Sequence, residues 1–97
     1  MATFVVLGKF TAQGAKTLPD VRKMAEGNQE RAKRLGAKIH GWYMTQGQYD
    51  FVVLAEAPDA ETMLASAAGA GGTGNVHTET LRAFTLDEAE QVLKKLG

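Results

Sequence analysis

The chain has 97 residues, which fits one small domain, and its 11 basic and 11 acidic side chains cancel. This balance argues against a nucleic-acid partner, because such binding depends on a basic face that neutralises phosphates. The absence of cysteine excludes disulfides and thiolate chemistry. No apolar run approaches the roughly 18 residues of a membrane span, and no basic leader is visible. We therefore expect a cytoplasmic protein with neither a membrane nor a nucleic-acid partner.

The first segments predict a strand followed by a helix. Residues 3–10 are mostly β-branched and aromatic, which is typical of a strand. After a polar connection, Pro19 suits the first turn of a helix, and Gly36 suits the position after its end. Spacings of three and four give this helix one mostly apolar stripe: Val21, Met24, Ala25, Asn28, Ala32 and Leu35. The basic run Arg31–Arg34 falls in its last turns, where cations favour the negative end of the helix dipole.

The middle of the chain predicts a β-hairpin. Residues 37–45 and 49–56 form the two strands around Gln46-Gly47-Gln48, where glycine supplies the positive φ of a tight turn. Pro58 cannot continue the ladder, and Asp59 is a suitable N-cap for the helix that follows.

The last third predicts a helix, a strand and a final helix. The Ala-rich residues 60–69 form the helix, and residues 76–84 form the fourth strand. The glycine-rich stretch 69–75 ends a helix and enters a strand, the reverse of a phosphate-binding loop, so we expect a connection there. Thr85 and Glu88 form a capping box for the C-terminal helix.

The order of these elements predicts an α+β, ferredoxin-like βαββαβ fold with a C-terminal helix, as a single domain over residues 1–97. Its four-stranded antiparallel sheet has the strand order 4-1-3-2, with both crossover helices on one face.

The central strands carry apolar side chains on both faces of this sheet. The first strand places Phe4 and Val6 on one face and Val5 and Leu7 on the other, and residues 49–56 alternate in the same way. The two crossover helices cover only one face, and the C-terminal helix spans only about 17 Å, enough for part of the other. We therefore expect a homodimer with the sheets face to face, or a higher homo-oligomer.

Several stretches resemble the bacterial GYD-domain family: residues 4–14, residues 36–59 with Gly47-Gln48-Tyr49-Asp50 as the Gly-x-Tyr-Asp signature, and residues 74–85 with TETLRAF. The resemblance implies a dimeric α+β barrel without an assigned activity. A similar hairpin occurs in the effector-binding domains of leucine-responsive-type transcription regulators, which bind amino acids at oligomer interfaces. This chain lacks their helix-turn-helix.

The hairpin holds most of the candidate site residues. Strict alternation predicts that His40, Trp42 and Tyr49 share one face, while Tyr43 and Asp50 share the other. Histidine is the side chain that ordinarily changes charge near neutral pH, so His40 is the candidate general base, although an edge-strand position without a catalytic role is the simpler interpretation. Trp42 and Tyr49 either pack in the core or an interface, or line a pocket.

Asp50 has a structural interpretation as well. It is expected to satisfy backbone donors at the end of the hairpin, and it could also accept a hydrogen bond from the hydroxyl of Tyr43 or Thr45. Arg82 is expected to pair with Glu79 or Glu56, with binding of a ligand carboxylate as the alternative.

Metal and cofactor sites are not expected. His40 and His77 lie on opposite edges of the predicted sheet, roughly 14 Å apart, which is too far for them to share one metal ion.

Three functions follow from these patterns. The first is binding of a small organic molecule in a sheet/helix or subunit-interface pocket. The second is a cofactor-independent enzyme of the dimeric α+β-barrel type, monooxygenase- or isomerase-like, with His40 as base. The third is a structural or adaptor oligomer. The candidate ligand-binding residues are His40, Trp42, Tyr43, Tyr49, Asp50 and Arg82.

Overall fold

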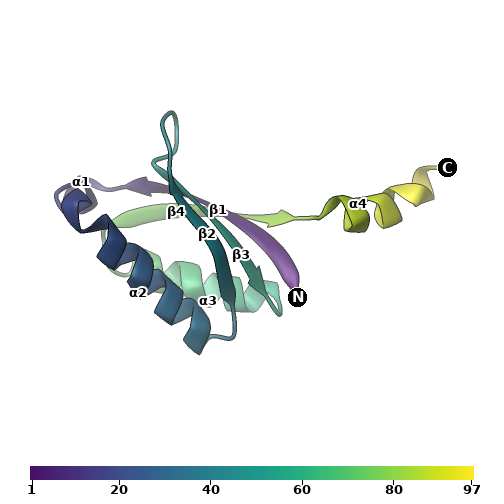
Figure 1. The fold of residues 1–97 in the computed structure, drawn as a ribbon, viewed down its shortest axis with the longest axis horizontal. Coiled ribbons are helices and arrows are strands. Elements are labelled where there is room, and N and C mark those ends of the chain that lie inside the picture. Colours follow the sequence, from purple (N-terminus) through teal and green to yellow (C-terminus); the bar gives the residue numbers. More distant parts are fainter.

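A computed structural model describes the whole chain, Met1–Gly97. It contains one four-stranded antiparallel sheet in the order β2-β3-β1-β4, the predicted 4-1-3-2 order counted from the opposite edge (Figure 1). The α+β, ferredoxin-like prediction is therefore confirmed. The strands are β1 (Ala2–Phe10), β2 (Lys38–Met44), β3 (Phe51–Ala57) and β4 (Val76–Ala83).

The two long helices lie on one face of the sheet, while the C-terminal helix extends away from it past the end of β4 (Figure 1). The C-terminal helix is long enough to cover part of the second sheet face, but within this chain it covers none. The helices are α1 (Ala12–Ala15), α2 (Val21–Arg34), α3 (Ala60–Gly71) and α4 (Leu86–Leu93), with 3-10 turns at Leu18–Asp20 and Lys94–Leu96.

The predicted turns and caps are confirmed. Gly36 and Gly47 have φ values of 83° and 110°, which a glycine adopts without steric cost. Asp59 caps α3 by accepting hydrogen bonds from the hydroxyl and the backbone N–H of Thr62, and these bonds lower the pKa of the Asp59 carboxyl. Thr85 and Glu88 form the capping box of α4.

The core lies between the sheet and helices α2 and α3. Its β-sheet side consists of buried side chains from alternate positions of β1 and β3, such as Phe4, Phe51 and Ala55. The helices contribute the small or flexible side chains Ala32 and Met63. The core is therefore formed mainly by one sheet face and small helix residues.

A β-bulge at His40 changes the predicted alternation in β2. Ile39 pairs with Ala55 and Gly41 pairs with Leu54, so His40 is an extra residue in the ladder. Because of this extra residue, Ile39 and Trp42 both face the helices, whereas strict alternation assigns them to opposite faces. The prediction that His40 shares a face with Trp42 is wrong for the same reason.

The opposite sheet face, which we call the open face, is covered by no element of the chain (Figure 1). Its centre is apolar, and Leu54 and Leu81 keep 37% and 42% of their surface exposed. The strand registers place the following side chains there: Val5, Leu7, Val52, Leu54, Leu81 and Tyr43. The predicted apolar character of both sheet faces is thus confirmed.

We predict that Gly8→Ala destabilises the fold by about 1–3 kcal/mol, because a Cβ at this position would overlap the ring of Phe51. The matched control is Gly27→Ala in α2, where a Cβ meets no atom within 4 Å. This control should stabilise the protein by about 0.5–1 kcal/mol through helix propensity. Urea unfolding of both variants checks the pair, and equal effects would contradict the packing explanation.

Candidate functional site

Asp50 fastens the end of the hairpin to β1. Its carboxylate Oδ2 accepts a hydrogen bond from the Phe10 N–H at 2.8 Å, and its own N–H donates to the Gly8 carbonyl oxygen at 2.8 Å. The predicted bond to backbone donors is confirmed, although the donor belongs to the neighbouring strand. No bond from a hydroxyl of Tyr43 or Thr45 is formed. Instead, the Thr45 hydroxyl donates to the Tyr49 carbonyl oxygen at 2.6 Å.

Tyr49 reaches across the sheet to the edge strand. Its hydroxyl donates to Glu79 Oε2 at 2.7 Å, and Lys9 Nζ lies 5.5 Å from the centre of its ring. The hydrogen bond to the Glu79 carboxylate and the negative charge of that group raise the pKa of Tyr49. Glu79 is paired with Leu7 on the open face, so this contact belongs to the rim of that face.

Trp42 is a packing residue on the helix side. Its ring stacks on Phe51 with 4.9 Å between centroids and 7° between planes. The indole N–H is buried without an acceptor. The surroundings of Trp42 are those of a core aromatic residue.

His40 lies apart from Trp42. Its Nε2 is 2.9 Å from Glu56 Oε1, and its side chain is 50% exposed. Glu56 alternates with the buried Ala55 and Ala57 on β3, so this pair lies on the side of the open face. The bulge therefore separates the candidate base from the aromatic ring expected beside it.

Arg82 pairs with neither of the predicted acidic residues. It lies on the helix-facing side of β4, 3.8 Å from Glu88, and its guanidinium lies 4.3 Å from the centre of the Phe84 ring. The predicted partners Glu79 and Glu56 lie on the other face, which corrects that expectation. An ion pair this exposed contributes little to stability.

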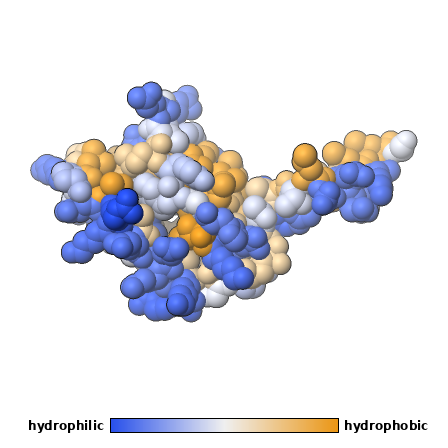
Figure 2. Space-filling view, in the orientation of Figure 1, coloured by the Kyte–Doolittle hydropathy of each residue, from blue (hydrophilic) through white to orange (hydrophobic).

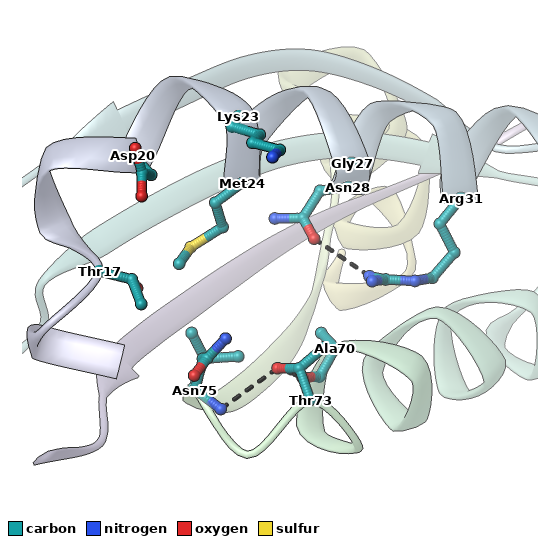
Figure 3. A pocket seen from close by; sticks show the side chains of 11 residues that line it. Thr17, Asp20, Lys23, Met24, Gly27, Asn28, Arg31, Ala70, Thr73 and Asn75 are labelled. Atoms are coloured by element: carbon teal, nitrogen blue, oxygen red, sulfur yellow. Dashed lines mark hydrogen bonds between the residues drawn. The ribbon is translucent and has the colours of Figure 1, made fainter. Parts of the chain in front are cut away.

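A cleft of about 300 Å³ opens between α2 and the end of α3 (Figure 3). We call it the α2/α3 cleft, and none of the six candidate residues lines it. Asn28 and Arg31 from α2 face Ala70, Thr73 and Asn75 across it. The complete lining is Thr17, Asp20, Lys23, Met24, Gly27, Asn28, Arg31, Ala70, Thr73, Asn75 and Val76.

A narrower space of about 50 Å³ runs between the helices and the sheet. We call it the inner cavity, and it shares Asn28, Arg31 and Ala70 with the cleft. Apart from these residues its walls are mostly apolar and include Val53 and Met63. The sequence offered one signal for this region, which is the polar Asn28 within an otherwise apolar helical stripe.

The glycine-rich stretch 69–75 forms the connection that its position predicted. It ends α3 and is tied to α1, since the Thr11 hydroxyl donates to the Gly74 carbonyl oxygen at 2.7 Å. The Gln13 side chain donates to Asn75 Oδ1 at 3.0 Å. Through Thr73 and Asn75 the connection forms one wall of the α2/α3 cleft.

No three histidine, aspartate or glutamate side chains come close enough together to hold a metal ion. His40 and His77 belong to the two edge strands, β2 and β4. None of the helices combines the length and the apolar character that crossing a lipid bilayer requires.

Comparison with known proteins agrees with this geometry. A family model of the GYD domain matches residues 4–93, nearly the whole chain. The chain belongs to the GYD-domain family. It is also 36% identical over 95 residues to a protein of Thermus thermophilus named "Glutamine synthetase and cystathionine beta-lyase binding protein". The match covers 97% of this chain and 100% of that relative.

We predict that Asp50→Ala in this GYD-domain protein costs about 1–3 kcal/mol of stability, because the Phe10 N–H loses its acceptor. Asp50→Asn keeps one oxygen acceptor and should cost less. The control Asp87→Asn, at an exposed position of α4, should stay within about 0.5 kcal/mol. Thermal and urea unfolding measure all three, and an Asp50→Ala variant as stable as the control would contradict this assignment.

Proposed function

We propose that this GYD-domain protein is a homodimeric protein-binding module, in which two open faces pack against each other. The observation that carries the proposal is the apolar sheet face that no element of the chain covers. Exposed apolar patches of this kind in folded proteins mark interaction sites. A second copy of the chain brings a patch of the same shape and chemistry, which a twofold dimer requires.

The distribution of charge on the open face supports a dimer interface. Apolar side chains occupy its centre, whereas the charged and titratable ones lie toward its edges and ends. An apolar centre with a polar rim is the usual composition of a protein–protein interface. The rim consists of Lys9, Lys38, His40, Glu56, His77 and Glu79.

The C-terminal segment Leu86–Leu96, which we call the arm, supplies the area that the sheet alone lacks. Four strands about 4.8 Å apart and eight residues long cover only about 500 Å², whereas a stable interface buries about 800 Å² per partner. One side of the arm is hydrophobic and the other hydrophilic (Figure 2). Leu86 and Leu96 on the arm are 88% and 84% exposed. We propose that this apolar side packs on the partner copy.

The protein-binding part of the proposal rests on the relative. That protein is named for binding two enzymes, and this chain matches it over its entire length. A small dimer with two copies of each surface suits such a role, because it would present every binding surface twice. We propose that this chain likewise binds metabolic enzymes, including a glutamine synthetase.

The two other predicted functions differ in their support. The enzyme hypothesis loses its key arrangement, because the bulge separates His40 from Trp42. Small-molecule binding remains the second candidate, and the α2/α3 cleft is the observation that favours it. Ligand-binding roles for His40, Trp42, Tyr43, Tyr49, Asp50 and Arg82 stay predictions, as does the cytoplasmic location.

We predict that the wild-type protein has twice its chain mass of 10.4 kDa by light scattering at low micromolar concentration. Leu54→Lys on the open face should shift it at least tenfold toward monomer, because the charge would be buried against the partner. The control Leu64→Lys, at an exposed position of α3, should leave the dimer intact. A monomeric wild-type protein would refute the dimer.

We predict that the purified dimer binds glutamine synthetase or cystathionine beta-lyase from its own source organism, measured by surface plasmon resonance with each purified enzyme. Leu64→Lys and Arg34→Gln, both on the outer helix surface, test whether that surface takes part. Absence of binding to both enzymes by a dimeric wild-type protein would refute the protein-binding part and leave the dimer standing.

A further inference from the structure

Arg31 lies at the junction of the α2/α3 cleft and the inner cavity without an acidic partner. The ion pairs of the chain are His40–Glu56 and Arg82–Glu88, so neither Arg31 nor Lys23 is neutralised by a direct contact. The cleft contains these two cations and one carboxylate, that of Asp20. Its lining is therefore positively charged in a protein whose total charge is zero.

The Arg31 side chain is held in place from two sides. Its Nη1 donates a hydrogen bond to Asn28 Oδ1 at 3.0 Å, one turn earlier on α2 (Figure 3). Its stem lies against Gly69 of α3, where a Cβ would come within 2.8 Å of Arg31 Cδ and 2.9 Å of Nε. Because a guanidinium has five N–H donors and Asn28 uses one, the others are available to a ligand carboxylate.

The two spaces beside Arg31 differ in polarity. The cleft is lined by polar side chains, including Thr73 and Asn75, and opens to solvent. The inner cavity has mostly apolar walls, including Val53, Ala55 and Met63. Its volume of about 50 Å³ accommodates about three or four water-sized groups. A molecule that satisfied both spaces would carry a negative group at one end and a short hydrocarbon chain at the other.

We propose that the α2/α3 cleft binds a small carboxylate with an apolar tail, with the carboxylate on Arg31 and the tail in the inner cavity. This deepens the small-molecule alternative stated under the proposed function. It does not depend on the protein-binding role, because the cleft lies on the helix side of the sheet.

The test is a titration of the isotope-labelled full-length protein, followed by amide NMR shifts. The probes are acetate, butanoate and hexanoate, with hexan-1-ol, hexylammonium and inorganic phosphate for comparison. We expect hexanoate to shift the amides around Asn28, Ala67 and Ala70. Each added methylene should tighten binding about fourfold until the cavity is full. The alcohol, the amine and phosphate should bind at least tenfold more weakly than hexanoate.

Variants separate the two ends of the site. Arg31→Gln should weaken hexanoate binding at least tenfold, whereas the matched control Arg34→Gln, one turn later on the exposed side, should have no effect. If Arg31→Gln fails to fold, Gly69→Ala tests the same point, because its Cβ displaces the Arg31 side chain. Ala67→Leu narrows the inner cavity, so it should remove the gain from acetate to butanoate while leaving acetate binding unchanged.

Two results would overturn the proposal. One is the absence of shifts near the cleft at tens of millimolar hexanoate. The other is binding that is equally strong for hexan-1-ol or phosphate and insensitive to Arg31→Gln. Light scattering on the same samples reports the dimer independently, so failure of this site and failure of the proposed dimer are distinguishable.

Discussion

The rest of this structure depends on a sheet whose two central strands are apolar on both faces while the chain covers only one. Burial of apolar surface contributes about 25 cal/mol per Å², so leaving one such face in water forgoes a large part of the available stabilisation. Helices α2 and α3 cover the first face and bury it in a core of mostly small residues. The second face and the apolar side of α4 are left exposed together, and this common exposure is the observation on which the proposed dimer rests.

The family signature has a structural role that this constraint explains. Asp50 ties the hairpin to β1 through the Phe10 N–H, just beyond the point where Gly8 pairs with Phe51. Gly8 leaves room for the Phe51 ring, and that ring in turn stacks on the ring of Trp42. Asp50 and Trp42, which the sequence offered as candidate site residues, thus stabilise the sheet, and both of its faces remain free for packing. Their arrangement is compatible with a binding protein, and the bulge separates His40 from the ring of Trp42.

The two sides of the sheet then have different properties. The open side is broad, apolar and rimmed by charge, which suits a protein surface. On the helix side, α2 and α3 leave a cleft between them. The Arg31 guanidinium lies where this cleft meets the inner cavity and has no acidic partner. The two surfaces lie on opposite sides of the sheet, so a protein partner and a small molecule would not compete for one site.

The sequence by itself determined the element order, the strand order, the caps at Asp59 and Thr85, and the exposed second face. These features follow from local rules, namely alternation, helical spacing and turn chemistry, which are visible along the chain. Only the tertiary structure decided the rest. A single extra residue in β2 reversed the face of His40 and of the positions before it, and no local pattern marks where a bulge forms. The cleft was equally hidden, because Asn28 and Arg31 of α2 meet Asn75 only when α2 packs beside the end of α3. Contacts between segments distant in sequence depend on tertiary packing, which no single segment specifies.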